Sequence, residues 1–212
     1  MIKRVIFDLD NTIIDWKDEY LNVVIDIVNN MNLGYDLDKV KQIDKVFSDY
    51  EDYKVNLEPE KFIKFINDGC NTNLPVEFIY KVIEGQGKCA EKLSEEKIEL
   101  FKYLSNKYEL MILSNWFTKT QEERLKIAGI YQYFKYISGG DKHSLKPSIH
   151  AFDEVLNGIM PNEAVMIGDS ISKDIEPAIS LGMNAILISS KNIRKDIRYK
   201  RISDLNELKN IL

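Results

Sequence analysis

Two aspartates separated by a single leucine follow a short apolar stretch near the start of the chain, in the segment FDLDNT (residues 7–12). Alternate residues of an extended chain point the same way, so the side chains of Asp8 and Asp10 share one side. Two neighbouring carboxylates repel each other unless a cation or a hydrogen-bond donor compensates them. The pair therefore indicates either a cation site or a turn that happens to use aspartate.

Polar side chains also gather at or just beyond two other apolar runs of the sequence. Ser114 and Asn115 end the run ELMILSN, and Gly168, Asp169 and Ser170 end the run AVMIGDS. Carboxylate oxygens are ligands that divalent cations such as Mg²⁺ prefer. Any one of these clusters is weak evidence, but together they indicate a single site.

These side chains need elements that bring them together, and the pattern after about residue 89 supplies such elements. Strands are expected at residues 2–8, 109–115, 135–140, 164–170 and 184–189, and helices at 94–106, 120–129, 148–159, 174–182 and 203–212. Strands that alternate with helices predict an α/β fold with a parallel sheet covered on both faces. Ligands of such sheets bind beyond the carboxyl ends of the strands, where the polar clusters are expected.

The segment between the first strand and residue 89 has a helical pattern throughout and is rich in aromatic residues. Helices are expected at Trp16–Met31, Leu37–Tyr53, Pro59–Asp68 and Pro75–Glu84. The aromatic side chains are expected to pack between these helices, and a few could line a pocket. Trp16 could either touch a substrate or pack against the first helix. The predicted division is an α/β domain of residues 1–14 and 90–212, with a helical domain of residues 15–89 inserted into it.

The motifs, taken in order, resemble those of the haloacid dehalogenase (HAD) superfamily, in its phosphatase branch. DLDNT is similar to the family's first motif, D-x-D-x-T, and Ser114 in ILSN matches the second. Lys146 in LKPS matches the third, and GDSISKD, with Asp169 and Asp174, matches the fourth. The resemblance spans the chain. It implies a Rossmann-like core with a parallel sheet, in which the helical segment stands where the family places its helical C1 cap.

The resemblance implies a Mg²⁺-dependent enzyme that works through an aspartyl-phosphate. Asp8 would be the nucleophile, and its carboxylate and that of Asp169 would bind the metal ion. Asp10 would give the metal its backbone carbonyl, while its side chain protonates the leaving oxygen and later activates water. The family's dehalogenases lack an acid at this position, so Asp10 favours phosphoryl transfer over carbon–halogen cleavage.

The same resemblance assigns the remaining site residues. Ser114 would hydrogen-bond the phosphoryl oxygens, and Lys146 would offset the charge that accumulates there. Thr12 and Asn115 would belong to the substrate-binding segments, with Thr12 supporting the turn of the first motif. Asp174 would hold the metal through water or position Lys146.

Each assignment has an ordinary structural alternative. Ser114 could be a helix cap, and Asp174 could be an acid favoured by the positive end of a helix. Lys142 competes with Lys146 for the same role. His143 and His150 are expected to have no catalytic part, because one is predicted in a loop and the other on a helix.

The leading hypothesis is a phosphatase of a small phosphorylated metabolite, of the sugar phosphate, nucleoside monophosphate or phosphoglycolate type. The alternatives are a phosphomutase on the same scaffold and a non-catalytic HAD-like binding protein. Release of inorganic phosphate, rather than isomerised product, separates the first hypothesis from the second.

Composition limits the class of protein further. The chain has 212 residues and a net charge of −5, which argues against a nucleic-acid polymer as partner. Its two cysteines are far apart and are expected to be reduced thiols in a cytoplasmic protein. No apolar run has signal-peptide or membrane-spanning length, so no membrane partner is expected. A homo-oligomer is left open. The basic run at residues 191–201 is expected to be a solvated connection.

Overall fold

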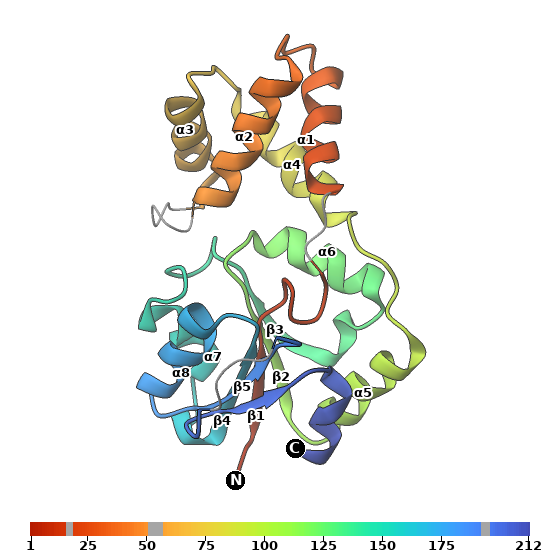
Figure 1. Ribbon diagram of the computed structural model, residues 1–212, viewed down its shortest axis with the longest axis vertical. Coiled ribbons are helices and arrows are strands. Elements are labelled where there is room, and N and C mark those ends of the chain that lie inside the picture. Colours follow the sequence, from red (N-terminus) through yellow and green to blue (C-terminus); the bar gives the residue numbers. More distant parts are fainter. Residues whose placement is uncertain (16–18, 51–56, 192–195) are drawn as a thin grey trace.

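A parallel sheet of six strands forms the centre of the protein in the computed structural model (Figure 1). The structure describes residues 1–15, 19–50, 57–191 and 196–212, so Trp16 lies outside the described residues. The strands are β1 (Arg4–Phe7), β2 (Glu109–Leu113), β3 (Phe134–Ser138), β4 (Ala164–Gly168), β5 (Asn184–Ile188) and β6 (Lys200–Ile202). The predicted α/β fold with a parallel sheet is confirmed.

The order of the strands is β3-β2-β1-β4-β5-β6. Strands β2 and β3 therefore lie on one side of β1, and β4, β5 and β6 lie on the other. Phe7 at the end of β1 pairs with Ile112 of β2 and Ile167 of β4. The carboxyl ends of these three strands therefore meet at one place on the sheet edge. This is the position at which open α/β sheets bind ligands.

Helices occupy both faces and the carboxyl edge of this sheet. They are α1 (Glu19–Asn30), α2 (Leu37–Asp49), α3 (Pro59–Cys70), α4 (Val76–Gly87), α5 (Glu95–Ser105), α6 (Thr118–Ala128), α7 (Asp153–Leu156) and α8 (Glu176–Ser180). We call α1–α4 the helical insert. Figure 1 shows it at one end of the molecule, beyond the carboxyl edge of the sheet, with α6 between the two. The division of the chain into two domains at residues 14/15 and 89/90 stays a prediction.

The side chains of the strands are buried on both sides of the sheet. Val5 and Phe7 belong to one apolar cluster, and Ile6 between them belongs to another on the opposite face. This alternation follows from the two-residue period of a strand. Every residue of β1 is buried, as expected of a strand covered on both faces.

Aromatic side chains pack among aliphatic ones in the core of the helical insert, as the sequence predicts. Phe47, Phe62 and Phe78 pack there together with Trp116, which comes from the segment after β2. The ring centroid of Trp116 lies 5.2 Å from that of Tyr50. The insert and the sheet edge therefore share one apolar cluster.

Three segments differ from the sequence-based expectation. Residues 148–159 were expected to form one helix, but they form a 3₁₀ turn (Ile149–Phe152) followed by the four-residue α7. The end of the chain is a 3₁₀ helix (Leu205–Asn210) rather than an α-helix. The basic run 191–201 contains the start of β6, an edge strand in which Lys200 and Arg201 are exposed and Ile202 is buried.

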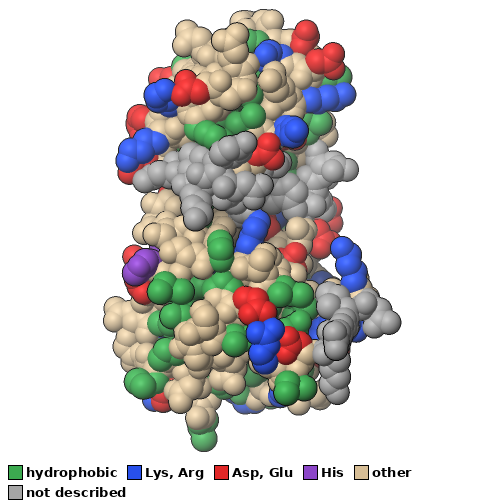
Figure 2. All heavy atoms as spheres, turned by 60° about the vertical axis from the view of Figure 1, so that its left-hand side comes forward, with side chains coloured by type: hydrophobic (Ala, Val, Ile, Leu, Met, Phe, Trp, Pro, Cys, Tyr) green, Lys and Arg blue, Asp and Glu red, His purple; other side chains and the backbone are tan. Residues whose placement is uncertain are grey.

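The surface and the cysteines agree with an ordinary globular protein. Figure 2 shows acidic and basic side chains interspersed over the helical insert, and hydrophobic side chains over the part that contains the sheet. Cys70 and Cys89 are both free thiols, as expected. Within the described ranges, no helix combines the length and the apolar character that crossing a lipid bilayer requires.

Candidate active site

The turn after β1 fixes the two aspartates that the first motif supplies. The backbone amide of Asp8 donates to the carbonyl of Ile167 in β4, at 2.9 Å. Leu9 is fully buried, and its carbonyl accepts backbone hydrogen bonds from residues 12–14. Asn11 takes the left-handed conformation (φ 58°), which asparagine tolerates better than most residues. Leu9 thus anchors the turn, and the carboxylates of Asp8 and Asp10 both line the cavity above it.

Lys146 forms ion pairs with residues from two segments, the turn after β1 and the segment after β4. Its ammonium group donates to Asp8 Oδ1 at 2.8 Å and to Asp174 Oδ1 at 2.6 Å. The backbone of Lys146 is held by the side chain of Asn115, through hydrogen bonds of 2.7 and 2.9 Å. Lys142, the alternative, is exposed and donates to the carbonyl of Ile137. The structure therefore brings Lys146, and not Lys142, to Asp8.

Three carboxylates converge beside this lysine. Each of Asp8, Asp169 and Asp174 offers an oxygen, and these oxygens all lie within 4.8 Å of one another. Asp174 approaches because residue 168 is glycine: a Cβ there would lie 2.3 Å from Asp174 Oδ2. The donor set consists of hard oxygen ligands at close quarters, so these residues fit a divalent cation such as Mg²⁺. The metal role expected of the Asp10 carbonyl stays a prediction.

The charges of this cluster do not balance without a further cation. Burial raises the pKa of Asp8 to about 8; Lys146 opposes this rise, and Asp174 and Asp10 add to it. Burial and the nearby Asp174 also raise the pKa of Asp169. Burial disfavours the charge on Lys146, but Asp174 and Asp8 outweigh it and raise the pKa of Lys146 above its usual range. One ammonium thus faces three carboxylates, and a divalent cation would offset the two negative charges that remain when all three are ionised.

Helix α6 holds Asp10 and Ser114 through two residues that the sequence analysis missed. Gln121 donates to Asp10 Oδ2 at 2.6 Å and to Ser114 Oγ at 2.7 Å. Arg124 is completely buried and forms an ion pair with Asp10 Oδ1. It also donates to Gln121 Oε1 at 2.8 Å. Both residues are buried on α6, a helix with few apolar residues, so no local pattern of the sequence set them apart from solvated residues.

The remaining predicted residues take different places. Thr12 is buried below Asp8 and donates to Asp8 Oδ2 at 3.2 Å, and it is not one of the residues that line the cavity. Ser114 and Asn115 both line it. His143 contacts the carbonyl of Ser144, and His150 is exposed beside Asp153. Neither histidine lines the cavity.

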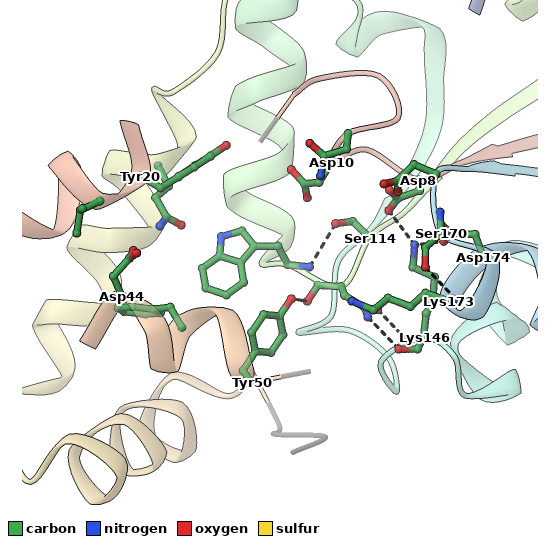
Figure 3. A pocket seen from close by; sticks show the side chains of 17 residues that line it. Asp8, Asp10, Tyr20, Asp44, Tyr50, Ser114, Lys146, Ser170, Lys173 and Asp174 are labelled. Carbon is green, nitrogen blue, oxygen red and sulfur yellow. Dashed lines mark hydrogen bonds and ion pairs between the residues drawn. The ribbon is translucent and has the colours of Figure 1, made fainter. Parts of the chain in front are cut away.

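A cavity of about 670 Å³ lies between the sheet edge and the helical insert. Figure 3 shows Asp8, Asp174 and Lys146 on one side and Tyr20, Asp44 and Tyr50 on the other. Tyr20 comes from α1, while Asp44 comes from α2. A small organic molecule could therefore contact the acidic cluster at one end and the helical insert at the other.

Comparison with known proteins agrees with this geometry. N-acylneuraminate-9-phosphatase from Homo sapiens is 26% identical over 216 residues, which cover 90% of this chain and 84% of that protein. Glyceraldehyde 3-phosphate phosphatase from Methanothermobacter thermautotrophicus is 34% identical over 119 residues, which cover 51% of this chain and 53% of that protein.

Solved structures show the same fold. The Bacillus subtilis protein YfnB, a structure bound to magnesium, covers 100% of this chain and 98% of its own, with a TM-score of 0.71 and 20% identity. A HAD phosphatase from Thermococcus onnurineus covers 99% of this chain and 97% of its own, with a TM-score of 0.66 and 24% identity. A family model described as haloacid dehalogenase-like hydrolase matches residues 5–188. The chain belongs to the haloacid dehalogenase-like hydrolase family.

Proposed function

We propose that the protein is a Mg²⁺-dependent phosphatase that hydrolyses a small phosphorylated metabolite through an aspartyl-phosphate. The observation that carries this proposal is the convergence of the carboxylates of Asp8, Asp169 and Asp174 around Lys146. The curated relatives, named as phosphatases, support the same reaction class.

In the first step, a carboxylate oxygen of Asp8 attacks phosphorus and the bond to the leaving oxygen breaks. Lys146 offsets negative charge at the reacting group, and its contacts with Asp8 and Asp174 hold it there. Ser114 Oγ lines the cavity and can donate its proton to a phosphoryl oxygen, because the hydrogen bonds that it makes with Gln121 and Trp116 use it as acceptor.

Asp10 acts as general acid in the first step and as general base in the second. Its carboxylic acid protonates the leaving oxygen, and the carboxylate then accepts a proton from the water that attacks the aspartyl-phosphate. That attack releases phosphate and restores the Asp8 carboxylate. Asp10 lines the cavity beside Asp8, which is the position that these transfers require.

Asp8 and Asp169 would hold the metal ion, with Asp174 beside them. When bound, Mg²⁺ would screen the repulsion between the nucleophile and the anionic phosphoryl group. The helical insert would act as a cap that covers the site, excludes bulk water and contacts the leaving group. The cavity between α1, α2 and the sheet edge supports this role.

Phosphate release from a panel of phosphorylated metabolites in the presence of Mg²⁺ tests the proposal. We expect Asp8→Asn to lower turnover by at least about a thousandfold, because it removes the nucleophile. Asp26→Asn, a matched change at an exposed position of α1, is the control and should keep full turnover. Undiminished turnover in Asp8→Asn, or isomerised product without free phosphate, would overturn the assignment.

A further inference from the structure

The side of the cavity formed by the helical insert carries hydrogen-bond acceptors and aromatic rings. Asp44 from α2 and Gln86 from α4 line it, next to the rings of Phe47 and Tyr50. Of the described residues that line the cavity, Lys146 and Lys173 alone are positively charged. Lys146 lies in a turn and Lys173 in the π-helical segment Ile171–Ile175, both in the α/β part, at the end of the cavity where phosphate would bind.

Asp44 lines the cavity, and its environment is unusual for a carboxylate. It is half-buried, and burial raises its pKa. Figure 3 shows it beside Tyr20, across the cavity from Asp8 and Lys146. A carboxylate that has lost part of its water is stabilised by hydrogen-bond donors or by a cation, and it is destabilised by a second anion.

Gln86 provides an independent observation that points the same way. It is only 2% exposed, and no residue in the described part of the chain donates a hydrogen bond to its Oε1 atom. An amide oxygen left without a donor costs free energy, and a ligand hydroxyl would recover it once a turn of the Gln86 side chain brings Oε1 to the surface of the cavity that this residue lines. Two acceptors on one wall thus favour a ligand that carries donors.

We infer that the organic part of the substrate is a neutral polyol or sugar, whose hydroxyl groups donate to Asp44 and Gln86. The Asp44 carboxylate on the same wall repels substrates that carry a carboxylate or another phosphate in addition to the phosphoryl group that is hydrolysed. This inference rests on the proposed phosphatase function and narrows its substrate class. The rings of Phe47, Tyr50 and Trp116 would pack against the carbon skeleton, as aromatic side chains do in small-molecule sites.

Two matched pairs of phosphomonoesters test the inference in the unaltered protein. Glycerol 3-phosphate and 3-phosphoglycerate differ in a hydroxymethyl group against a carboxylate, and sorbitol 6-phosphate and 6-phosphogluconate differ likewise at the end far from phosphorus. We expect kcat/KM to favour the neutral member by at least about tenfold in at least one pair, because a second anion meets Asp44. Equal or inverted preference in both pairs would overturn the inference.

Variants of opposite charge sharpen this test. Asp44→Asn should lower the preference for the neutral member by about tenfold, and Gln86→Glu should raise it, because the first removes a negative charge from the wall and the second adds one. Asp26→Asn removes an exposed charge from α1 and should leave the ratio unchanged. A ratio that moves alike in all three variants would contradict the assignment, as would one that moves in none. If a variant fails to fold, the comparison within the unaltered protein still decides.

p-Nitrophenyl phosphate separates failure of this inference from failure of the proposed function. This ester has no hydroxyl groups and no second anion. If the protein with Mg²⁺ hydrolyses it while the matched pairs show no preference, only the substrate class is wrong. If the protein hydrolyses neither this ester nor any member of the pairs, the phosphatase proposal itself is wrong.

Discussion

The carboxylate of Asp10, to which we assign proton transfer, is held on both of its oxygens. Arg124 contacts one of its oxygens and Gln121 the other, both from α6. A carboxylate has about four acceptor positions, so each oxygen can still accept from a ligand. Helix α6 therefore sets the direction in which Asp10 faces the cavity, while Gln121 orients Ser114 from the same turn.

Removal of Arg124 should affect substrates according to their leaving groups. We expect Arg124→Met to lower kcat/KM for an alkyl phosphate at least about tenfold more than for p-nitrophenyl phosphate. The reason is that p-nitrophenolate leaves without a proton, whereas an alkoxide needs the proton that a correctly oriented Asp10 delivers. Steady-state kinetics with both esters measures the difference.

Arg124→Lys provides the matched control, because it keeps the positive charge but loses the planar group that contacts both Asp10 and Gln121. It should recover part of the lost alkyl phosphatase activity. Equal losses with the two esters in Arg124→Met would show that Arg124 supports the fold of the site without orienting Asp10.

The sequence predicted the acidic residues of the site but not the residues that orient Asp10. Asp8 and Asp169 were predictable because each directly follows an apolar strand, and parallel strands end at one edge. Arg124 was not, because its partner Asp10 lies 114 residues away and no local pattern links them. On a surface helix the same Gln121 and Arg124 would look like ordinary solvated residues.

At the scale of elements, the segment after β4 depends on the absence of a side chain at Gly168. The chain turns through a π-helical segment (Ile171–Ile175) into α8, which brings Asp174 back over the end of the strand. The Ser170 amide donates to Asp174 Oδ2 at 3.1 Å and fixes the carboxylate there. A Cβ at residue 168 would meet the Oδ2, Cγ and Cβ atoms of Asp174 at 2.3 to 2.6 Å.

Gly168→Ala should therefore push Asp174 away from Lys146 and Asp8. We expect a loss of about 1–3 kcal/mol in the free energy of unfolding, together with weaker Mg²⁺ binding. Urea denaturation and titration calorimetry measure the two effects. Gly69→Ala in α3 is the matched control, because its Cβ would make only ordinary contacts of 3.6 Å with Val46. That control should be neutral or slightly stabilising, since alanine favours helix; an equal loss in both variants would contradict the account.

The elements that the sequence predicted poorly are those with little apolar pattern. β6 has three residues and a single buried side chain, Ile202, so its sequence KRI gives no alternation to detect. Among the described residues β6 pairs with β5 alone, which leaves Lys200 and Arg201 on an exposed edge. Charged residues are common on such edges because they discourage pairing with other chains.

At the scale of the whole molecule, the helical insert is connected to the site by specific contacts. The hydroxyl of Tyr50 at the end of α2 donates to the carbonyl of Asn115 at 2.8 Å, and Asn115 in turn holds Lys146. The ring of Tyr20 in α1 lies 5.5 Å from the guanidinium carbon of Arg124. The two sides of the cavity are thus joined through the residues that position the lysine and the acid.

The stability of the whole fold should depend jointly on pH and on Mg²⁺ binding. In the cation-free protein the pKa of Asp8 is raised to about 8, whereas in an unfolded chain it is near 3.9. Between these values the folded state binds a proton that the unfolded state does not, so this group's contribution to stability falls as pH rises and is lost above about pH 8. Mg²⁺ requires the ionised carboxylate and replaces that proton.

The increase in Tm caused by Mg²⁺ should therefore be larger at pH 8.5 than at pH 6. With free Mg²⁺ about one hundredfold above Kd, binding adds about 2.7 kcal/mol, which is about 5–10 °C for a chain of this size. Thermal melts with Mg²⁺ and with a chelator across this pH range measure the increment. In Asp8→Asn the increment should be smaller and depend less on pH, because residue 8 no longer titrates. An increment that is constant, or that shrinks towards alkaline pH, would mean that protons and Mg²⁺ do not compete for Asp8.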